Sequence, residues 1–318
     1  MANLPEIPAD LRALMAEIGP RWPTDTKGYI RLMIDKFTEV LKAAPRDGIS
    51  IETVRYGAHE RQQFEVFQPG GARAKPGVIF VHGGAFTEGS RHRSSEIYAN
   101  VLTYFARHDV VGINAGYRLA PDACYPEATR DLAAIVRWMR ENAARLNVDP
   151  GRIFLMGHSA GGAHVGSYAY DSRHQPAEGH GLAGVLIISG RMRADARSEN
   201  PNASRVAAYY GTDTGRYDDL SPVTHIDAQS PPTFIACAEF ENPLIDVYCF
   251  ELAYRLGAAK GHAPPFAWMK GHNHTSIIGQ FNTAEDALGR ACLDFIGQTT
   301  ARLIVFNRDT ILKAAEFR

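Results

Sequence analysis

The serine at position 159 lies in the run GHSAGG at 157–162, between an apolar stretch and a helical one. The stretch 152–156 is typical of a short strand, and Ala160 begins a run typical of a helix. A serine on such a sharp strand-to-helix turn exposes its hydroxyl at the helix N-terminus, where backbone N–H groups favour negative charge. This arrangement predicts Ser159 as a catalytic nucleophile. An inert serine in a glycine-rich turn is the alternative.

A second glycine-rich loop, HGGAF at 82–86, directly follows the apolar run 77–81. Acyl transfer needs backbone N–H donors aimed at the oxyanion of the tetrahedral intermediate, and glycines let the backbone approach the substrate closely. Loops of this type supply one such donor, and the residue after the nucleophile supplies another. The loop therefore predicts an oxyanion hole, with an ordinary tight turn after a strand as the alternative.

A serine nucleophile also needs a general base, most often a histidine. Two histidines, His272 and His274, follow the apolar run 266–269, in the place of the loop after the final strand of such a sheet. Both are candidates for the base. An H-x-H metal pair is the alternative, but no acidic cluster accompanies the two histidines, so the sequence predicts no metal site.

The carboxylate that orients the base is expected after the apolar run 233–236. Three acids follow this run: Glu239, Glu241 and Asp246. Glu241 falls in the turn before a helical stretch and is the preferred candidate, because from there it can point across the end of the sheet. Asp246 is the second choice, since it falls in the first helical turn, where a carboxylate also complements the helix dipole.

These residues are spaced along a chain that alternates strand-like and helix-like segments from 77 to 297. Such alternation is typical of a parallel sheet covered by helices on both faces, so we predict an α/β fold with eight strands. A polar, irregular stretch at 191–224 is expected to lie over one end of the sheet. The predicted strands are 51–56, 63–67, 77–81, 110–113, 152–156, 185–188, 233–236 and 266–269, and the predicted helices are 29–44, 98–107, 128–146, 160–170, 245–256 and 284–296.

Length and composition restrict the partners and the compartment. The chain has 318 residues and a net charge of −1, which gives no electrostatic basis for binding nucleic acid or an acidic membrane. No apolar run is long enough for a membrane span, and no secretion signal is visible at the N-terminus. The four cysteines form no CxxC pair, which favours reduced core thiols, and the cytoplasm is the expected compartment.

We predict a single domain over 1–318 with an extension at each end. Apolar residues at helical spacing in 29–44 indicate an amphipathic helix, so 1–45 is expected either to form a helical cap over a pocket or to pack against the body. Residues 299–318, with an apolar run at 303–306, form a C-terminal extension. An edge strand, an oligomer arm and a packed tail all fit this extension, which leaves a homodimer open.

Four segments together resemble the α/β-hydrolase superfamily and, within it, the hormone-sensitive-lipase-like esterases. They are HGGAF at 82–86, YRLAP at 117–121 with Tyr125-Pro126, GHSAGG at 157–162 and GHNH at 271–274. The resemblance covers residues 60–297. It implies an eight-stranded, mostly parallel sheet whose second strand is antiparallel, with an N-terminal helical cap. It also implies Ser159 as nucleophile and the backbone N–H groups of Gly83, Gly84 and Ala160 as the oxyanion hole.

The resemblance also bears on the base and the acid. The family's histidine loop matches His274 better than His272, because a small polar residue and then a helix follow it. The family's acid motif is Asp-Pro-Leu, but this chain has Asn-Pro-Leu beginning at Asn242, so Glu241, one residue earlier, is the nearest substitute. The HGGAF loop has an alanine in place of the family's third glycine, which a loop of backbone donors tolerates.

These features predict a serine hydrolase that cleaves carboxylic esters with short- to medium-chain acyl groups, through an acyl-enzyme on Ser159. The substrate is expected to be a small molecule, and no cofactor is expected. Cleavage of amides, as in the related arylformamidases, is the near alternative, because the catalytic apparatus is shared. A non-catalytic hydrolase-fold protein that binds a ligand is the alternative from another class, although such proteins normally lack a triad member.

Overall fold

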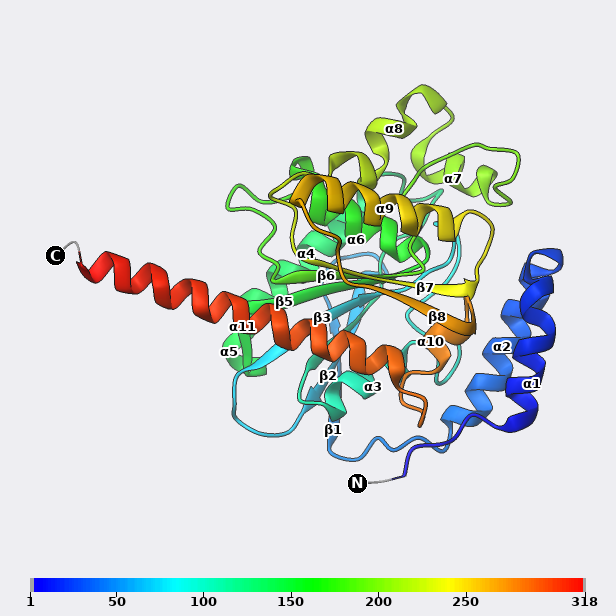
Figure 1. Ribbon diagram of the computed structural model, residues 1–318, viewed down its shortest axis with the longest axis horizontal. Helices are drawn as coiled ribbons and strands as arrows, with labels where there is room; N and C mark the ends of the chain where they lie inside the picture. Colours follow the sequence, from blue (N-terminus) through cyan, green and yellow to red (C-terminus); the bar gives the residue numbers. More distant parts are fainter. Residues whose placement is uncertain (1–2, 317–318) are drawn as a thin grey trace.

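The computed structural model describes residues 3–316, and their side chains as far as Ala301. Eight strands form one sheet in the order β1-β2-β4-β3-β5-β6-β7-β8, with helices on both faces (Figure 1). The predicted α/β architecture with eight strands is therefore confirmed. The strands are β1 (Ile49–Arg55), β2 (Gln63–Pro69), β3 (Lys75–Val81), β4 (Val111–Ala115), β5 (Val148–His158), β6 (Gly184–Ile188), β7 (Thr233–Phe240) and β8 (Phe266–Asn273).

Helices fill most connections between the strands, as the alternating pattern predicted. Residues 128–146, predicted as one helix, form two, because α4 ends at Glu141 and the left-handed backbone of Asn147 (φ +52°) stops α5. The stretch 191–224, expected to be irregular, contains α7 and α8. The helices are α1 (Ala9–Ile18), α2 (Thr26–Leu41), α3 (Ala99–Arg107), α4 (Glu127–Glu141), α5 (Ala143–Leu146), α6 (Ala160–Tyr170), α7 (Ala203–Tyr210), α8 (Tyr217–Leu220), α9 (Ile245–Lys260), α10 (Ser276–Gly279) and α11 (Ala287–Glu316).

The second strand runs against its neighbours. β2 pairs antiparallel with β1 and β4, whereas every pairing among β3 to β8 is parallel. This is the direction pattern that the family resemblance implied. Parallel strands end at the same edge of a sheet, so the loops after β3, β5, β6, β7 and β8 meet at one end. Those loops, the last residues of the strands before them and the helix starts beside them carry every candidate site residue.

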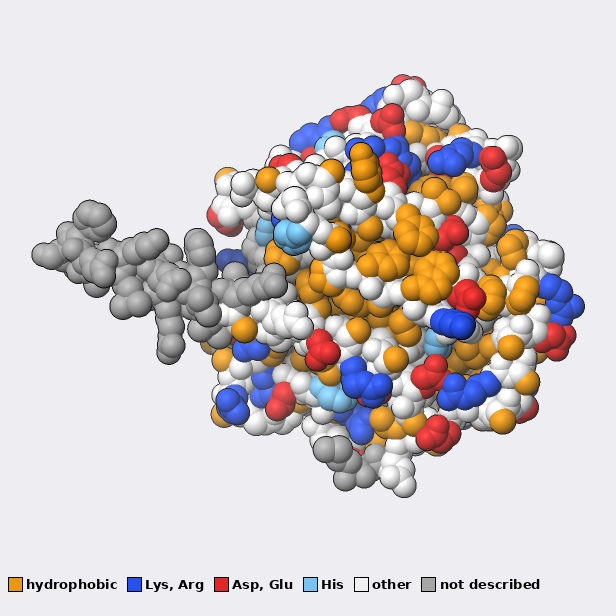
Figure 2. All heavy atoms as spheres, in the orientation of Figure 1, with side chains coloured by type: hydrophobic (Ala, Val, Ile, Leu, Met, Phe, Trp, Pro, Cys, Tyr) orange, Lys and Arg blue, Asp and Glu red, His pale blue; other side chains and the backbone are white. Residues whose placement is uncertain are grey.

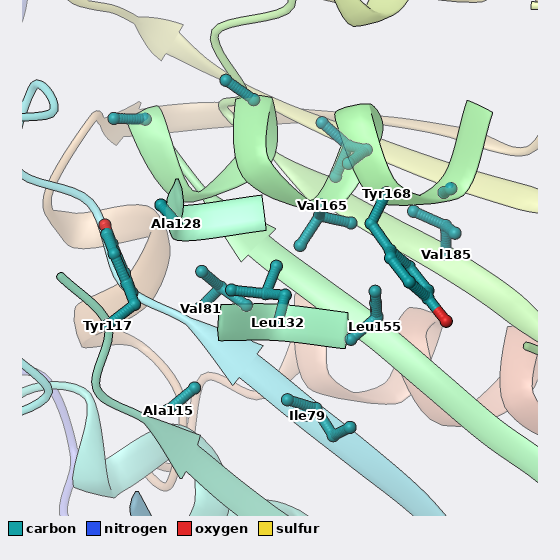
Figure 3. Packing of buried hydrophobic residues seen from close by; sticks show 14 of the residues in the cluster. Ile79, Val81, Ala115, Tyr117, Ala128, Leu132, Leu155, Val165, Tyr168 and Val185 are labelled. Atoms are coloured by element: carbon teal, nitrogen blue, oxygen red, sulfur yellow. The ribbon is translucent and has the colours of Figure 1, made fainter. Parts of the chain in front are cut away.

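Alternate residues of the central strands pack on opposite faces, which is why these strands are apolar throughout. In β3, Ile79 and Val81 join the cluster that packs against α4 and α6, while Val78 and Phe80 join the opposite cluster. Figure 3 shows the first cluster, in which Val165 of α6 faces the strands. Buried on both faces, the central strands form a rigid support for the loops at their ends.

The N-terminal segment stands beside α10 and the carboxyl ends of β7 and β8, at one side of the molecule (Figure 1, dark blue). Phe37 of α2 packs so closely on Gly279 of α10 that any side chain at position 279 would collide with its ring. Trp22, in the 3-10 helix Gly19–Thr24, is fully buried and donates Nε1–H to Oδ1 of Asn242 over 2.9 Å. The segment is therefore packed against the end of the sheet that carries the candidate site.

One interpretation of the C-terminal extension is wrong. α11 runs without a break from Ala287 to Glu316, so the apolar run 303–306 is helical and not an edge strand. Side chains beyond Ala301 lie outside those described, and the oligomer-arm and packed-tail interpretations stay predictions. Among the described residues, no helix combines the length and the apolar character needed to span a bilayer.

Candidate active site

Ser159 lies on the sharp turn between β5 and α6. Its backbone has φ +56° and ψ −124°, a strained conformation for a residue with a side chain, and the neighbouring glycines make room for it. A Cβ on Gly161 would overlap the carbonyl oxygen of Val81 in β3, and one on Gly157 would crowd Gly162. Because the serine is only partly buried, the turn presents it at the edge of the sheet.

His274 and Glu241 form a buried pair at the same end of the sheet. Phe240, the last residue of β7, is paired with Asn273, the last residue of β8, so the residues that follow them lie side by side. His274 also donates its backbone N–H to the carbonyl oxygen of Phe240 over 3.0 Å. Its Nδ1 lies 2.5 Å from Oε2 of Glu241, and neither residue is more than 8% exposed.

This pairing determines which nitrogen of His274 carries the proton. A carboxylate accepts hydrogen bonds and does not donate them, so Nδ1–H donates to Glu241 and Nε2 of the neutral ring keeps its lone pair. An imidazole held in this tautomer by a carboxylate is the form that removes a proton from a serine hydroxyl.

The second histidine of the loop faces a different carboxylate. The His272 ring lies 3.1 Å from Oγ of Ser276 and 2.8 Å from a carboxylate oxygen of Glu285. The contact with His272 is the largest cause that lowers the pKa of Glu285, which falls to about 2. Because His272 and His274 face separate carboxylates, they do not form the alternative H-x-H metal pair. Within residues 3–301, no three potential metal ligands gather at one point.

The other two acids after β7 have partners away from the histidine. Glu239 accepts the backbone N–H of Gly271 over 2.6 Å. Asp246 accepts the N–H of Val247 over 2.9 Å in the first turn of α9. Of the three acids that the sequence offered, Glu241 is thus the one that the strand pairing brings to His274.

The oxyanion loop, 82–86, lies directly against the serine turn. A Cβ on Gly83 would come within 2.9 Å of Cβ of Ser159, so a larger residue would displace one of the two loops. Gly84 has φ +145°, and a Cβ there would overlap the carbonyl oxygen of Glu88. Ala85 (φ +49°) keeps a left-handed backbone where the related loops have a third glycine. These close backbone contacts are of the kind that an oxyanion hole requires.

The sequence did not predict a hydrogen-bond chain that joins the oxyanion loop to the histidine loop. The His158 ring lies between the hydroxyl of Tyr98 (Nδ1, 3.3 Å) and the carbonyl oxygen of His274 (Nε2, 3.0 Å). Burial lowers the pKa of His158 well below its usual range, so the ring is neutral and Nε2, which faces the carbonyl, carries the proton. The Tyr98 hydroxyl in turn accepts the N–H of Gly83 over 3.4 Å. No spacing signals this contact, because Tyr98 and His158 are 60 positions apart.

Two of the three predicted oxyanion donors, Gly83 and Ala160, differ in their surroundings. The N–H of Gly83 already has a partner, although a distant one, in the Tyr98 hydroxyl. Ala160 is the first residue of α6, so its N–H belongs to the groups that a helix leaves without an internal partner. A substrate oxygen would therefore meet less competition at Ala160 than at Gly83.

Comparison with solved structures identifies the fold. The thermostable carboxylesterase EstE1, cloned from a metagenomic library, matches with a TM-score of 0.68 at 20% identity, over 86% of this chain and 97% of that one. A bacterial heroin esterase matches with a TM-score of 0.66 at 20% identity, over 93% of this chain and 94% of that one. The chain therefore has the α/β-hydrolase fold that these esterases share.

Sequence comparison finds a family model and relatives that are named as esterases. Residues 64–180 match the family model described as BD-FAE. Versiconal hemiacetal acetate esterase of Dothistroma septosporum is 24% identical over 72% of this chain and 76% of its own length. Carboxylesterase NlhH of Mycobacterium tuberculosis is 40% identical over 27% of this chain, which spans only 26% of that relative. The predicted α/β-hydrolase fold is confirmed, and so is the similarity to carboxylesterases.

Proposed function

We propose that this protein is a serine hydrolase that cleaves carboxylic esters through an acyl-enzyme on Ser159. The observation that carries the proposal is the buried contact of 2.5 Å between Nδ1 of His274 and Oε2 of Glu241, at the sheet end where Ser159 stands on its strained turn. Burying a carboxylate costs free energy, so a buried histidine–carboxylate pair beside a strained serine is more typical of a functional site than of a core.

The proposed reaction follows from the tautomer of His274. Nε2 takes the proton of Ser159 as its oxygen attacks the ester carbonyl, and the oxyanion forms against N–H groups of the oxyanion loop and of Ala160. The imidazolium then protonates the leaving alcohol, while the acyl group stays on Ser159. Water, deprotonated by the same nitrogen, releases the acid and restores the serine. Glu241 stabilises the imidazolium throughout without taking its proton.

The names of the relatives support esters as substrates. Versiconal hemiacetal acetate esterase, carboxylesterase NlhH and the heroin esterase are all named for ester cleavage. The first is named for an acetate ester, which supports a short acyl group. We therefore propose small-molecule esters with short- to medium-chain acyl groups.

A chain-length series of p-nitrophenyl esters, from C2 to C12, tests the proposal, with Ser159→Ala as control. We expect serine-dependent turnover that is fastest at C2 to C6, and a loss of about 10⁴-fold or more in kcat for Ser159→Ala. Turnover in that variant equal to wild type would refute the role of Ser159. A fluorophosphonate probe should label wild type and leave Ser159→Ala unlabelled. A formamide substrate measured beside the esters separates the arylformamidase alternative.

We further propose that residues 1–45 form a cap that contributes to substrate binding. Trp22 supports this, because its indole N–H holds Asn242, the residue next to Glu241. Trp22→Phe keeps an aromatic ring and removes that hydrogen bond. The variant should raise KM more than it lowers kcat, and an unchanged KM would contradict the cap.

We also propose a homodimer formed through the free edge of the sheet. Among the described residues, β8 pairs with β7 and with no other strand. Phe250 (51%), Tyr254 (75%) and Trp268 (45%) are exposed on this edge and the adjoining α9, where Figure 2 shows an apolar patch. An edge strand can pair with its own copy about a two-fold axis and bury such side chains. Light scattering should give twice the 34.9 kDa chain mass for wild type and the single mass for Trp268→Glu. A monomeric wild type would contradict this.

Finally, we propose a cytoplasmic location. Cys237, Cys249 and Cys292 are buried free thiols, as expected in a reducing compartment. Cell fractionation tests the location, and recovery of the protein outside the cytoplasm would contradict it.

A further inference from the structure

The carboxylate of Glu241 is held from the side opposite to His274. We infer that Ser189, the residue that follows β6, is a positioning residue that holds Glu241 in line with the histidine. This inference rests on the proposed function, because it gives Ser189 a part in the same proton transfer. It concerns a residue that neither the motifs nor the family resemblance singled out.

The two oxygen atoms of Glu241 have separate partners. Oε2 faces Nδ1 of His274. Oε1 accepts a short hydrogen bond from the hydroxyl of Ser189 and the backbone N–H of Ala238 over 2.8 Å, and the thiol of Cys237 lies 3.7 Å away. The direction of these contacts matters, because a carboxylate with one oxygen anchored cannot rotate its other oxygen away from the histidine without losing hydrogen bonds.

The backbone at Ser189 is strained in a way that suits this role. Its φ is +48°, in the left-handed region where a side chain costs free energy, and the residue is fully buried. Its N–H is anchored to the carbonyl oxygen of Ala236 in β7 over 2.8 Å. A glycine would adopt this backbone without strain. A serine here retains a hydroxyl that reaches Glu241.

The acid needs such an anchor because of its identity and position. Glu241 comes one residue before Asn242, where the related esterases have aspartate, and its side chain has one more rotatable bond than aspartate. Each rotatable bond that must be fixed costs conformational entropy, and a loosely held acid would let the imidazole turn away from the serine. Ser189 and the N–H of Ala238 restrict that freedom before substrate binds.

The kinetic test uses two variants of Ser189 and a double-mutant cycle. Ser189→Ala removes the hydroxyl, and Ser189→Gly removes both the hydroxyl and the strain. We expect each to lower kcat about ten- to hundredfold, the effect of one hydrogen bond to a charged group, with KM changed less than threefold. In a Glu241→Ala background, where no carboxylate is left to hold, Ser189→Ala should have no further effect. Ser167→Ala, at another buried serine, serves as control.

Two kinetic results would overturn the inference. Wild-type kcat in Ser189→Gly would mean that the hydroxyl does not matter. A loss in Ser189→Ala that is equally large in the Glu241→Ala background would mean that Ser189 acts on the fold and not through the acid. Thermal unfolding of each variant shows whether it remains folded.

A spectroscopic test needs no substrate, and so it separates failure of this inference from failure of the proposed function. The Nδ1 proton of His274, shared with Glu241, should give a strongly downfield proton NMR signal in the resting protein, absent from Glu241→Ala. In Ser189→Ala this signal should move upfield or broaden. An unchanged signal would overturn the inference even if esters are hydrolysed, and a shifted signal would support it even if the esters tested are not substrates.

Discussion

Two buried histidines, His82 in the oxyanion loop and His164 in α6, should make the fold sensitive to mild acid. His82 is fully buried and His164 is 1% exposed, and burial lowers the pKa of each to about 3. Neither ring nitrogen of His164 has a hydrogen-bond partner among the described residues, and the ring packs between Tyr117 and Tyr209. The folded protein therefore keeps both rings neutral in a pH range where the unfolded chain protonates them.

The sign and the size of the effect follow from this difference. An unfolded histidine titrates near pH 6.5, so the stability contributed by the two neutral rings is complete above that pH and is lost progressively as the pH falls from 6.5 toward 3. At pH 5.0 each ring lowers the free energy of unfolding by about 2 kcal/mol, and the two together by about 4 kcal/mol. That is a large part of the free energy of unfolding of a typical domain, which is about 5–15 kcal/mol. For 318 residues it corresponds to a fall in Tm of about 6 °C.

The assay is thermal unfolding of wild type and His164→Leu at pH 7.5 and pH 5.0. Leucine fills much of the same space without titrating, so the Tm of this variant should fall about 3 °C less than that of wild type between the two pH values. His262→Leu, at an exposed histidine, should follow wild type. The comparison between variants removes the contribution of all other groups. Equal falls in Tm for wild type and His164→Leu would refute the reasoning.

Two further predictions concern the site. Glu241→Gln should lower kcat by about 10³- to 10⁴-fold, because it removes the charge that stabilises the imidazolium, whereas Asp246→Asn should keep kcat within about twofold of wild type. Steady-state kinetics on a short-chain ester measures both variants. A larger loss in Asp246→Asn than in Glu241→Gln would make Asp246 the triad acid. Tyr98→Phe removes the hydroxyl that lies between Gly83 and His158. This variant should lower kcat about tenfold with little change in KM, the effect expected for one lost hydrogen bond. An unchanged kcat would mean that the Tyr98 hydroxyl does not position either residue.

The sequence predicted the elements better than their ends. The strand predicted at 152–156 extends over Val148–His158, and it begins where Val148 pairs with Lys75 of β3. Residues 149–151 include a proline and a glycine and interrupt the apolar pattern between Val148 and the predicted strand. The final helix was predicted to end at 296 and continues to Glu316. In both cases the hydrophobic period stops before the element does, since periodicity reports burial and not backbone conformation.

The residues of the candidate site were likewise predicted only in part. Ser159, Glu241 and His274 could be proposed because each follows a strand, and strand ends meet at one edge of a parallel sheet. The choice of Glu241 over Asp246 needed only the turn position, and the pairing of Phe240 with Asn273 explains it. Ser189 and Tyr98 carry no such signal. Their roles depend on contacts across the sheet end, and any buried serine or tyrosine has the same local pattern.

The proposed acid, Glu241, and its neighbour Asn242 therefore have two different contacts on adjacent residues. Glu241 faces inward to His274 and Ser189, and Asn242 faces the N-terminal segment, where it accepts the indole N–H of Trp22. An aspartate at position 242, as in the related esterases, would have to serve both the histidine and Trp22. Moving the acid back by one residue frees position 242 to bind the N-terminal segment, at the cost of a longer, less restrained acid. Ser189 offsets that cost, so the shifted acid, its serine anchor and the N-terminal contact form one connected arrangement.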